Sequence, residues 1–465
     1  MSTATAPMQQ SERSEPNERS EHKDGGGAHA VAHSILNRMA MIAIQICTGI
    51  LTARMLQPRG RGELAAMILW PLFLASVTTL GIPSSLIYFL RKHTEGHATL
   101  ILNGVAMSVT FGCVAAGVSA LLMPRWLHQY SPSVVHGAQL FLLTVPLCSM
   151  MLAGQATLEA FGKFTYSNIV QILVPSATLA MLLLFLFTHH FNPFTAAISY
   201  VAAAVPVTLL IYYFLWRERT ASTGWKWSPS ACRMLLSYGI RSYGIDLLGT
   251  LALQVDTVLV ISLLQPSAMG VYAVMLSLSR MLSLFQSAVV MVLFPKTAGK
   301  PLEEIVELTE VAMRISVMIT AACAAILCFL GPVLIGIMYG RPFLSAVGAL
   351  RLLLVEATIS CAVAVLAQAF MAVGRPGIVT ILQAIGLGLC IPMMLLLIPR
   401  WGVAGAAASL LLSTTARFLF IYFGFRVFLR TRMPRLLPKL DDFRFIASVV
   451  RSRMQRSAEI PEAAQ

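Results

Sequence analysis

The chain has 465 residues, of which 57% are apolar and only 12% are charged. Soluble domains carry about 25% charged residues, so this composition excludes a soluble enzyme, a coiled coil and a disulfide scaffold. The apolar residues fall in blocks of about 20 to 28, the length that a helix needs to cross a bilayer core about 30 Å thick. Strands of an outer-membrane barrel would be shorter and alternating. The sequence therefore predicts an all-α polytopic membrane protein.

The apolar blocks predict twelve transmembrane helices joined by short connections. They cover residues 33–56, 64–89, 99–123, 137–160, 165–188, 193–216, 240–264, 269–294, 311–337, 345–373, 377–398 and 403–428. The first six spans form a predicted N-lobe, residues 33–216, and the last six a C-lobe, residues 240–428. The longest connection, residues 217–239, is predicted as a cytoplasmic linker between the lobes.

Both ends of the chain are predicted to be tails outside the membrane. Residues 1–32 are polar and predict a disordered cytoplasmic tail. Residues 429–465 are basic, and an amphipathic helix from Asp441 suits an anionic lipid surface. A solvated basic tail without such a helix stays open as the alternative.

The net charge of +14 is typical of positive-inside topology rather than of nucleic-acid binding. With the N-terminus in the cytoplasm, 21 lysines and arginines fall on the cytoplasmic side and five on the other side, Arg59 and Arg61 among the five. This asymmetry predicts that both termini are cytoplasmic.

The two halves of the sequence contain an internal repeat. The segment 56–58 (Leu-Gln-Pro) and Gly62 recur 208 positions later as 264–266 and Gly270. Because each half holds six predicted spans, both halves start on the same side of the membrane. Such parallel repeats, related by an axis along the membrane normal, are typical of transporters.

Polar residues mark two of the predicted spans. In the seventh, Asp246 and Gln254 lie on one helical stripe, with Asp256 at its edge. In the first, Arg38 and Gln45 form a similar stripe, which matches the seventh only in part under the repeat. The two stripes predict cavity-lining faces of opposite charge; a structural ion pair, and a snorkelling Arg38, stay open as alternatives.

Arg280 is the strongest single candidate for a binding residue. It lies about eleven residues into the eighth span, too deep to reach water cheaply. A guanidinium with its forked donors suits a phosphate or pyrophosphate. The alternative is a structural pair with Asp256 or Asp246. Elsewhere, Glu356 in the tenth span needs a partner on another span, and Arg417 in the twelfth is about as deep as Arg280.

No catalytic constellation, metal site or cofactor motif is predicted. The histidines lie in tails, loops or span ends, and the eight cysteines have no metal-ligand spacing. No GxxxxGK[ST] loop is present, so we do not expect ATP hydrolysis.

Several segments resemble the polysaccharide flippases of the multidrug/oligosaccharidyl-lipid/polysaccharide exporter superfamily. The resemblance covers nearly all of residues 33–428 and is carried by the segments 52–70, 256–259, 270–272, 294–295, 374–375 and 398–407. It implies a V-shaped pair of six-helix lobes with spans 1 and 7 lining a central cavity. Twelve spans depart from the related lipid II flippases, which usually have fourteen.

The resemblance implies a transporter of the bacterial inner membrane rather than an enzyme. The expected substrate is a polyprenyl-pyrophosphate-linked oligosaccharide for exopolysaccharide, capsule or O-antigen synthesis, flipped by alternating access. Expected partners are this lipid-linked anionic oligosaccharide, membrane lipids, and a polysaccharide polymerase with its export machinery, but no nucleic acid. We assign substrate binding to Arg280, Arg38, Gln45 and Gln254, and coupling or charge pairing to Asp246 and Asp256.

Two other functions stay open. One is a cation-coupled drug exporter of the same superfamily, although the arginines favour an anionic substrate. The other is a membrane-embedded polysaccharide polymerase or ligase, which would be expected to carry a large external loop.

Overall fold

The protein is helical throughout the part of the chain that the structure describes. A computed structural model describes residues 21–93, 96–217 and 225–436, with side chains from residue 40 on. Nine helices among these residues are long and apolar enough to cross a membrane. The all-α membrane fold is therefore confirmed, whereas the count of twelve spans stays a prediction. The amphipathic helix predicted from Asp441 lies outside the described residues.

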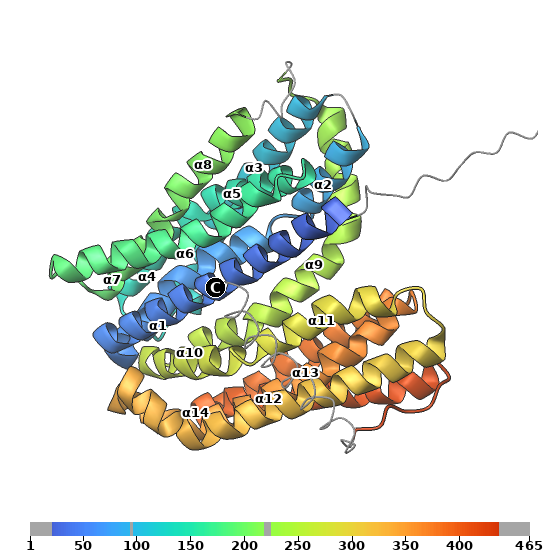
Figure 1. Cartoon of the computed structure of the whole chain (residues 1–465). Helices are drawn as coiled ribbons and strands as arrows, with labels where there is room; N and C mark the ends of the chain where they lie inside the picture. The colour runs from blue at the N-terminus through green and yellow to red at the C-terminus, as the bar shows by residue number, and fades with distance from the viewer. Residues whose placement is uncertain (1–20, 94–95, 218–224, 437–465) are drawn as a thin grey trace, which may run out of the picture.

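The helices form two groups, shown one above the other in Figure 1, which we call the N-lobe (α1–α8) and the C-lobe (α10–α14). The N-lobe consists of α1 (Glu21–Val77), α2 (Ile82–Lys92), α3 (His97–Trp126), α4 (Pro132–Phe141), the short 3₁₀ turn η1 (Leu142–Thr144), α5 (Val145–Ala160), α6 (Phe164–Phe187), α7 (Pro193–Ala202) and α8 (Ala204–Arg217).

The C-lobe follows a helix that runs between the two groups, α9 (Pro229–Leu263). It consists of α10 (Pro266–Arg280), α11 (Ser283–Thr297), α12 (Leu302–Met338), the 3₁₀ turn η2 (Arg341–Ala346), α13 (Val347–Ala372) and α14 (Pro376–Val427). The predicted lobe boundaries stay predictions, because residues 218–224 between the groups lie outside the described part.

Proline and glycine set many of the helix boundaries. Proline occupies the first turn of α4, α9, α10 and α14, where its missing N–H leaves no hydrogen bond unmade. Gly162 and Gly374, the repeat-equivalent residues after α5 and α13, have φ angles of 70° and 77°. This left-handed conformation favours glycine, so the repeat reproduces the same helix ending in both lobes.

Some predicted spans differ from the helices of the structure. Span 8, predicted as continuous, is broken after Arg280, where α10 ends and α11 begins at Ser283. In α1, two helical stretches meet at Gln57, whose φ of 59° is non-helical. Hydropathy does not detect the break after Arg280, because the residues on both sides of it are equally apolar. The break at Gln57, by contrast, lies at the polar segment 57–63, where the sequence predicts the connection between spans 1 and 2.

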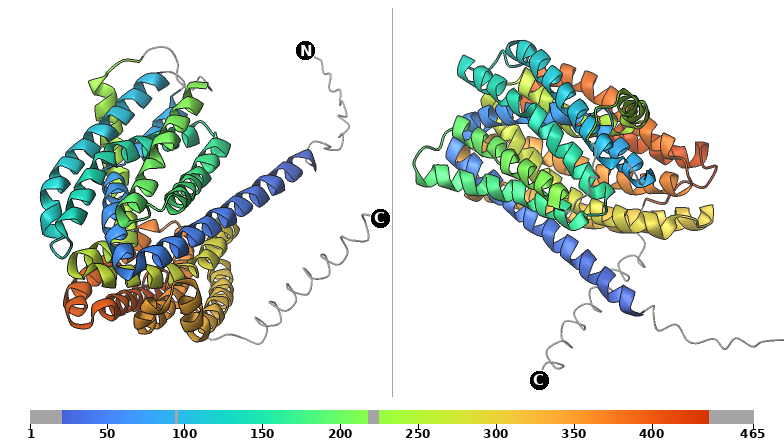
Figure 2. Two further views of the ribbon diagram at one scale, coloured as in Figure 1. Left: turned by 90° about the vertical axis from the view of Figure 1, so that its left-hand side faces the viewer. Right: turned by 90° about the horizontal axis from the view of Figure 1, so that it is seen from above.

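The N-terminal tail is shorter than predicted. Helix α1 begins at Glu21, so residues 21–32, predicted to be disordered, are helical. Figure 2 shows this first part of α1 projecting beyond the other helices.

Helix α9 connects the lobes rather than belonging to one of them. Its first half contacts the N-lobe: Ser85 Oγ donates a hydrogen bond of 2.8 Å to the Leu235 carbonyl, and Gly239 packs against Gly81 with their backbones in contact. Its second half packs in the C-lobe, where Asp256 contacts α10. One rigid helix therefore couples the positions of the two lobes.

The lobes also meet at the opposite end of α9, which we call the Gln57 end. Here Gly62 of α1 and Gly270 of α10 pack face to face. A Cβ on Gly62 would overlap the carbonyl oxygen of Pro266, and a Cβ on Gly270 would overlap that of Pro58. The contact is reciprocal between residues 208 positions apart, as the sequence repeat requires. Only glycine allows this backbone approach.

We predict that Gly270→Val separates the lobes at the Gln57 end, because the valine Cβ cannot occupy the space of the Pro58 carbonyl. We would attach spin labels at His128→Cys and Ser267→Cys in a background without native cysteines. Pulsed electron paramagnetic resonance should then report a longer distance between the two labels than in the protein with Gly270. The control is Gly348→Val, since a Cβ on Gly348 meets nothing within 4 Å. An unchanged distance in Gly270→Val would show that the contact does not set the lobe spacing.

Candidate functional site

A cavity of about 480 Å³ lies between the two lobes. The N-lobe contributes residues of α1, α6 and α7, and the C-lobe contributes residues of α10 together with Tyr339 after α12. Its charged lining residues are Arg61 and Arg280, and no carboxylate is among the described residues that line it. The cavity is therefore cationic, and it contains surface from both lobes.

Arg280 enters this cavity from the last turn of α10. Its side chain is 45% exposed, and its Nη2 atom donates to the Leu253 carbonyl at 2.8 Å and lies 3.4 Å from Asp256 Oδ2. Its position in the last turn of α10 places the cation near the negative end of the helix dipole, which favours it. Among the described residues, Arg280 makes its hydrogen bonds through Nη2, and the guanidinium has further N–H donors at the Nε and Nη1 atoms.

Asp256 is a buried carboxylate that holds Arg280 in place through an ion pair. Its side chain is only 2% exposed, and its Oδ2 accepts a hydrogen bond of 2.8 Å from the hydroxyl of buried Tyr272. Thr257 Oγ1 lies 3.3 Å from the other carboxylate oxygen. A buried carboxylate needs such partners, since an unpaired charge in a low-dielectric interior is costly. The arrangement fixes one edge of the guanidinium and presents the other.

The structure brings together only some of the predicted site residues. Gln45 lines the inter-lobe cavity with Arg280. Gln254 and Asp246 do not line it among the described residues; Asp246 is exposed and accepts a hydrogen bond from Ser84 Oγ at 3.1 Å. Arg38 lies in α1, but its side chain lies outside the described residues. The predicted polar stripe of α9 is therefore divided between different surroundings.

Arg61 is a cavity residue that the sequence reasoning missed. The hydropathy pattern placed it in a loop on the outer side, whereas the structure places it in the second helical stretch of α1. A proline at the start of a helix is a recognised signal, and Pro58 would have predicted a helix here. Arg61 then falls in its first turn, next to the interface glycine Gly62.

A second group of buried charges lies within the C-lobe. Glu356 of α13 accepts a hydrogen bond of 2.7 Å from Thr414 of α14, and Arg417 Nη2 donates to the Thr414 hydroxyl at 3.2 Å. The expected partner of Glu356 on another span is thus Thr414. This cluster joins α13 to α14, and none of its three residues is among the described residues that line the inter-lobe cavity.

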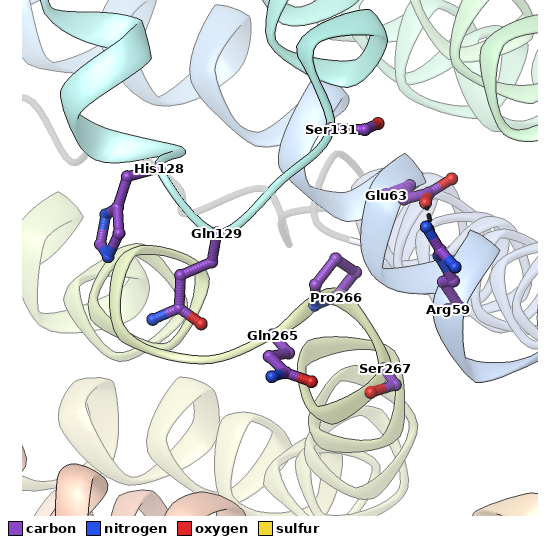
Figure 3. A pocket seen from close by; sticks show the side chains of 8 residues that line it. All are labelled: Arg59, Glu63, His128, Gln129, Ser131, Gln265, Pro266 and Ser267. Atoms are coloured by element: carbon purple, nitrogen blue, oxygen red, sulfur yellow. Dashed lines mark hydrogen bonds and ion pairs between the residues drawn. The ribbon is translucent and has the colours of Figure 1, made fainter.

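A larger cavity of about 680 Å³ lies at the Gln57 end, again between the lobes (Figure 3). Arg59 in its wall is paired with Glu63 at 3.2 Å, and Gln129 Nε2 of the N-lobe donates to the Leu263 carbonyl of α9 at 2.7 Å. Nearby, burial raises the pKa of Tyr130 above its ordinary value, with the Glu63 carboxylate as a second cause. Because its charges are balanced, this cavity is a weaker candidate for binding an ion.

Comparison with known proteins assigns the chain to a family. A family model described as polysaccharide biosynthesis protein matches residues 29–298, more than half of the chain. The chain belongs to this family. The matched region includes both arginines of the inter-lobe cavity and Asp256. No curated protein sequence matches the chain.

Solved structures of membrane transporters share the fold. A structure titled as the lipid II flippase MurJ in an inward closed conformation has a TM-score of 0.71 at 13% identity, covering 85% of this chain and 88% of that chain. An inward-facing multidrug resistance MATE family transporter of the MOP superfamily has a TM-score of 0.66 at 15% identity, covering 84% and 96%. These likenesses confirm the predicted superfamily fold, in a multi-pass membrane protein of the polysaccharide biosynthesis family.

We predict that Tyr272→Phe destabilises the protein by about 1.5–3 kcal/mol, because the buried Asp256 carboxylate loses its hydroxyl donor. The thermal unfolding midpoint of the purified protein in detergent measures this. In an Asp256→Asn background the same change should cost less, since the acceptor is neutral there. Equal costs in both backgrounds would contradict the role assigned to this hydrogen bond.

Proposed function

We propose that the protein is a transporter that flips a polyprenyl-pyrophosphate-linked oligosaccharide across the bacterial inner membrane by alternating access. The glycan and its pyrophosphate enter the cavity between the lobes while the polyprenyl tail stays in lipid. The product serves surface polysaccharide synthesis, and a polymerase with its export machinery uses it on the far side. Catalysis is not part of the proposal.

The observation that carries the proposal is the half-exposed Arg280 guanidinium in a cavity without carboxylates. A membrane protein exposes a deep arginine only at a cost of at least about 2.5–3.5 kcal/mol on insertion scales, which an anionic ligand would offset. The guanidinium fork suits two phosphate oxygens. Membership of the polysaccharide biosynthesis family and the MurJ-like fold support a lipid-linked glycan as the cargo.

The principal competing function is a cation-coupled drug exporter, since MATE transporters share the fold. A cavity for cationic drugs would be expected to contain carboxylates. The nearest one, Asp256, is buried beneath Arg280 and already paired with it. The charge of the cavity therefore favours an anionic substrate.

Arg280→Ala is expected to reduce glycan export about tenfold or more, because each lost charge-assisted hydrogen bond contributes roughly 1.5–3 kcal/mol. Arg280→Lys should recover only part of it, since one ammonium cannot make the forked contact. The measurement is surface polysaccharide in a strain lacking the native copy, with membrane protein quantified alongside. Normal export by a stable Arg280→Ala variant would remove Arg280 from the site.

Two controls separate binding from folding. Arg351→Ala changes an exposed arginine that does not line the inter-lobe cavity and should export normally. Arg280→Ala combined with Asp256→Asn removes the orphaned buried carboxylate, so protein level should recover while export stays low. Recovery of export together with protein level would support a purely structural ion pair.

The proposed orientation places both termini, and the Lys92 end of α2, in the cytoplasm, and the Gln57 end in the periplasm. Reporter fusions after residues 92, 163 and 375 should report cytoplasm, and fusions after residues 60, 128 and 190 periplasm. The basis is the asymmetry of 21 to five basic residues. A periplasmic C-terminus would overturn this topology and the parallel repeat with it.

A further inference from the structure

The cavity at the Gln57 end has the size of a small-molecule site. Its volume is about 680 Å³, and pockets that bind small ligands occupy about 300–1,000 Å³. Its lining comes from α1, from the connection between α3 and α4, and from the start of α10 (Figure 3). Both lobes therefore contribute to it, and the transport of a diphosphate through the inter-lobe cavity leaves it without a role.

The lining of this cavity is rich in groups that both donate and accept hydrogen bonds. Gln129 and Gln265 contribute side-chain amides, and Ser131 and Ser267 contribute hydroxyls. An amide has an acceptor oxygen and two donor hydrogens, and a hydroxyl has one donor and two lone pairs. The ligand that matches such a lining carries several groups that likewise donate and accept, as the hydroxyls of a sugar do.

The charges of the cavity wall neutralise each other. Arg59 Nε lies 3.2 Å from Glu63 Oε1, and no other lysine, arginine or carboxylate is among the described residues that line the cavity. An anion would have to compete with the Glu63 carboxylate for Arg59. The wall therefore favours an uncharged ligand.

The two amides of the lining differ in what they contact. Gln129 Nε2 donates to the Leu263 carbonyl, so this side chain is engaged in holding the wall to the end of α9. Gln265 is the N-cap residue of α10, yet its side chain makes no capping hydrogen bond. It is exposed and makes no other hydrogen bond to the described residues. The amide of Gln265 is therefore free to bind a ligand.

The internal repeat provides a second cavity for comparison. A cavity of about 490 Å³ at the same end is lined by residues that the offset of 208 relates to the first cavity: Pro58, Ser267 and Val271, the equivalents of Pro266, Arg59 and Glu63. Its described lining contains no charged residue and no side-chain amide. The repeat thus forms both cavities without needing amides, so the amides of the first cavity indicate binding rather than packing.

We propose that the cavity at the Gln57 end binds neutral sugar units of the transported glycan after the glycan has crossed the membrane. In the proposed orientation this end lies in the periplasm, on the side where the product is released. A glycan bound there is held outside the inter-lobe cavity, which lowers its return. This inference rests on the proposed function for the source of the sugar, and it adds a second site.

The test measures binding of five sugars to the full-length protein in nanodiscs by saturation-transfer NMR: glucose, galactose, mannose, N-acetylglucosamine and glucuronate. At least one of the four neutral sugars should bind. Glucuronate should bind no more tightly than glucose, because Arg59 is already paired. Gln265→Leu should weaken binding of the neutral sugars about three- to tenfold, since it removes the hydrogen bonds of the amide and keeps the size of the side chain.

Gln57→Leu is the matched control. Gln57 is the repeat equivalent of Gln265, is exposed, and does not line the cavity. This variant should bind the sugars as the wild type does, and both variants should keep the thermal unfolding midpoint. Binding of none of the four neutral sugars, tighter binding of glucuronate, or binding that Gln265→Leu leaves unchanged would each overturn the proposal.

Surface polysaccharide in a strain lacking the native copy distinguishes the two sources of sugar. If the site binds the lipid-linked glycan, Gln265→Leu should lower export at unchanged protein level, by no more than its loss of affinity. Lost sugar binding with unchanged export would assign the site to a free saccharide outside the membrane and overturn the role in release.

The same assays separate this inference from the proposed function. If the wild-type protein binds none of the sugars while Arg280→Ala abolishes export, the sugar site is wrong and the flippase proposal stands. If Arg280→Ala exports normally while Gln265→Leu loses sugar binding, the proposed function fails, and the cavity remains a saccharide site without a role in transport.

Discussion

The backbone contact between Gly62 and Gly270 is the constraint on which the arrangement of the lobes depends. It brings α1 and α10 closer than any side chain would permit, and it does so reciprocally between equivalent residues of the repeat. A second close approach, between Gly81 and Gly239, ties the start of α9 to the N-lobe. Small residues allow membrane helices to pack closely where the hydrophobic effect gives little drive. The inter-lobe cavity lies between helices that these two contacts position.

The charges near this cavity differ in how they are stabilised. Asp256 is buried and has Tyr272 and Arg280 as partners, so its cost is offset within the protein. Arg280 shares that pair but keeps much of its surface exposed. Arg61 is the opposite case, with buried N–H groups and no partner among the described residues. The protein thus fixes Arg280 in place through its own carboxylate, whereas Arg61 has no such partner among the described residues.

The sequence predicted the fold class from the length and number of its apolar blocks, and it singled out Arg280, which lines the inter-lobe cavity, from its depth in an apolar block. It did not predict the break after Arg280, since Met281 and Leu282 are as apolar as the helices around them. It grouped Asp246 with Gln254 by helical periodicity, but α9 contacts the N-lobe near Asp246 and the C-lobe near Asp256. Periodicity cannot show that one helix passes between two surroundings.

The repeat explains why Arg61 in particular was missed. At an offset of 208, the equivalent of Arg61 is Met269, which is 1% exposed in the C-lobe, and the equivalent of Arg280 is Leu72, which is 57% exposed in the N-lobe. The backbone contact follows the repeat, whereas the cations do not. A search for matching charges in the two halves therefore leads to Arg38 and Asp246 and passes over the pair that shares a cavity. Symmetry of the backbone lets the lobes pack against each other through equivalent residues. The two arginines that make the cavity cationic have no charged equivalent in the other half of the sequence. The residues that decide what the cavity binds are therefore found where the two halves differ.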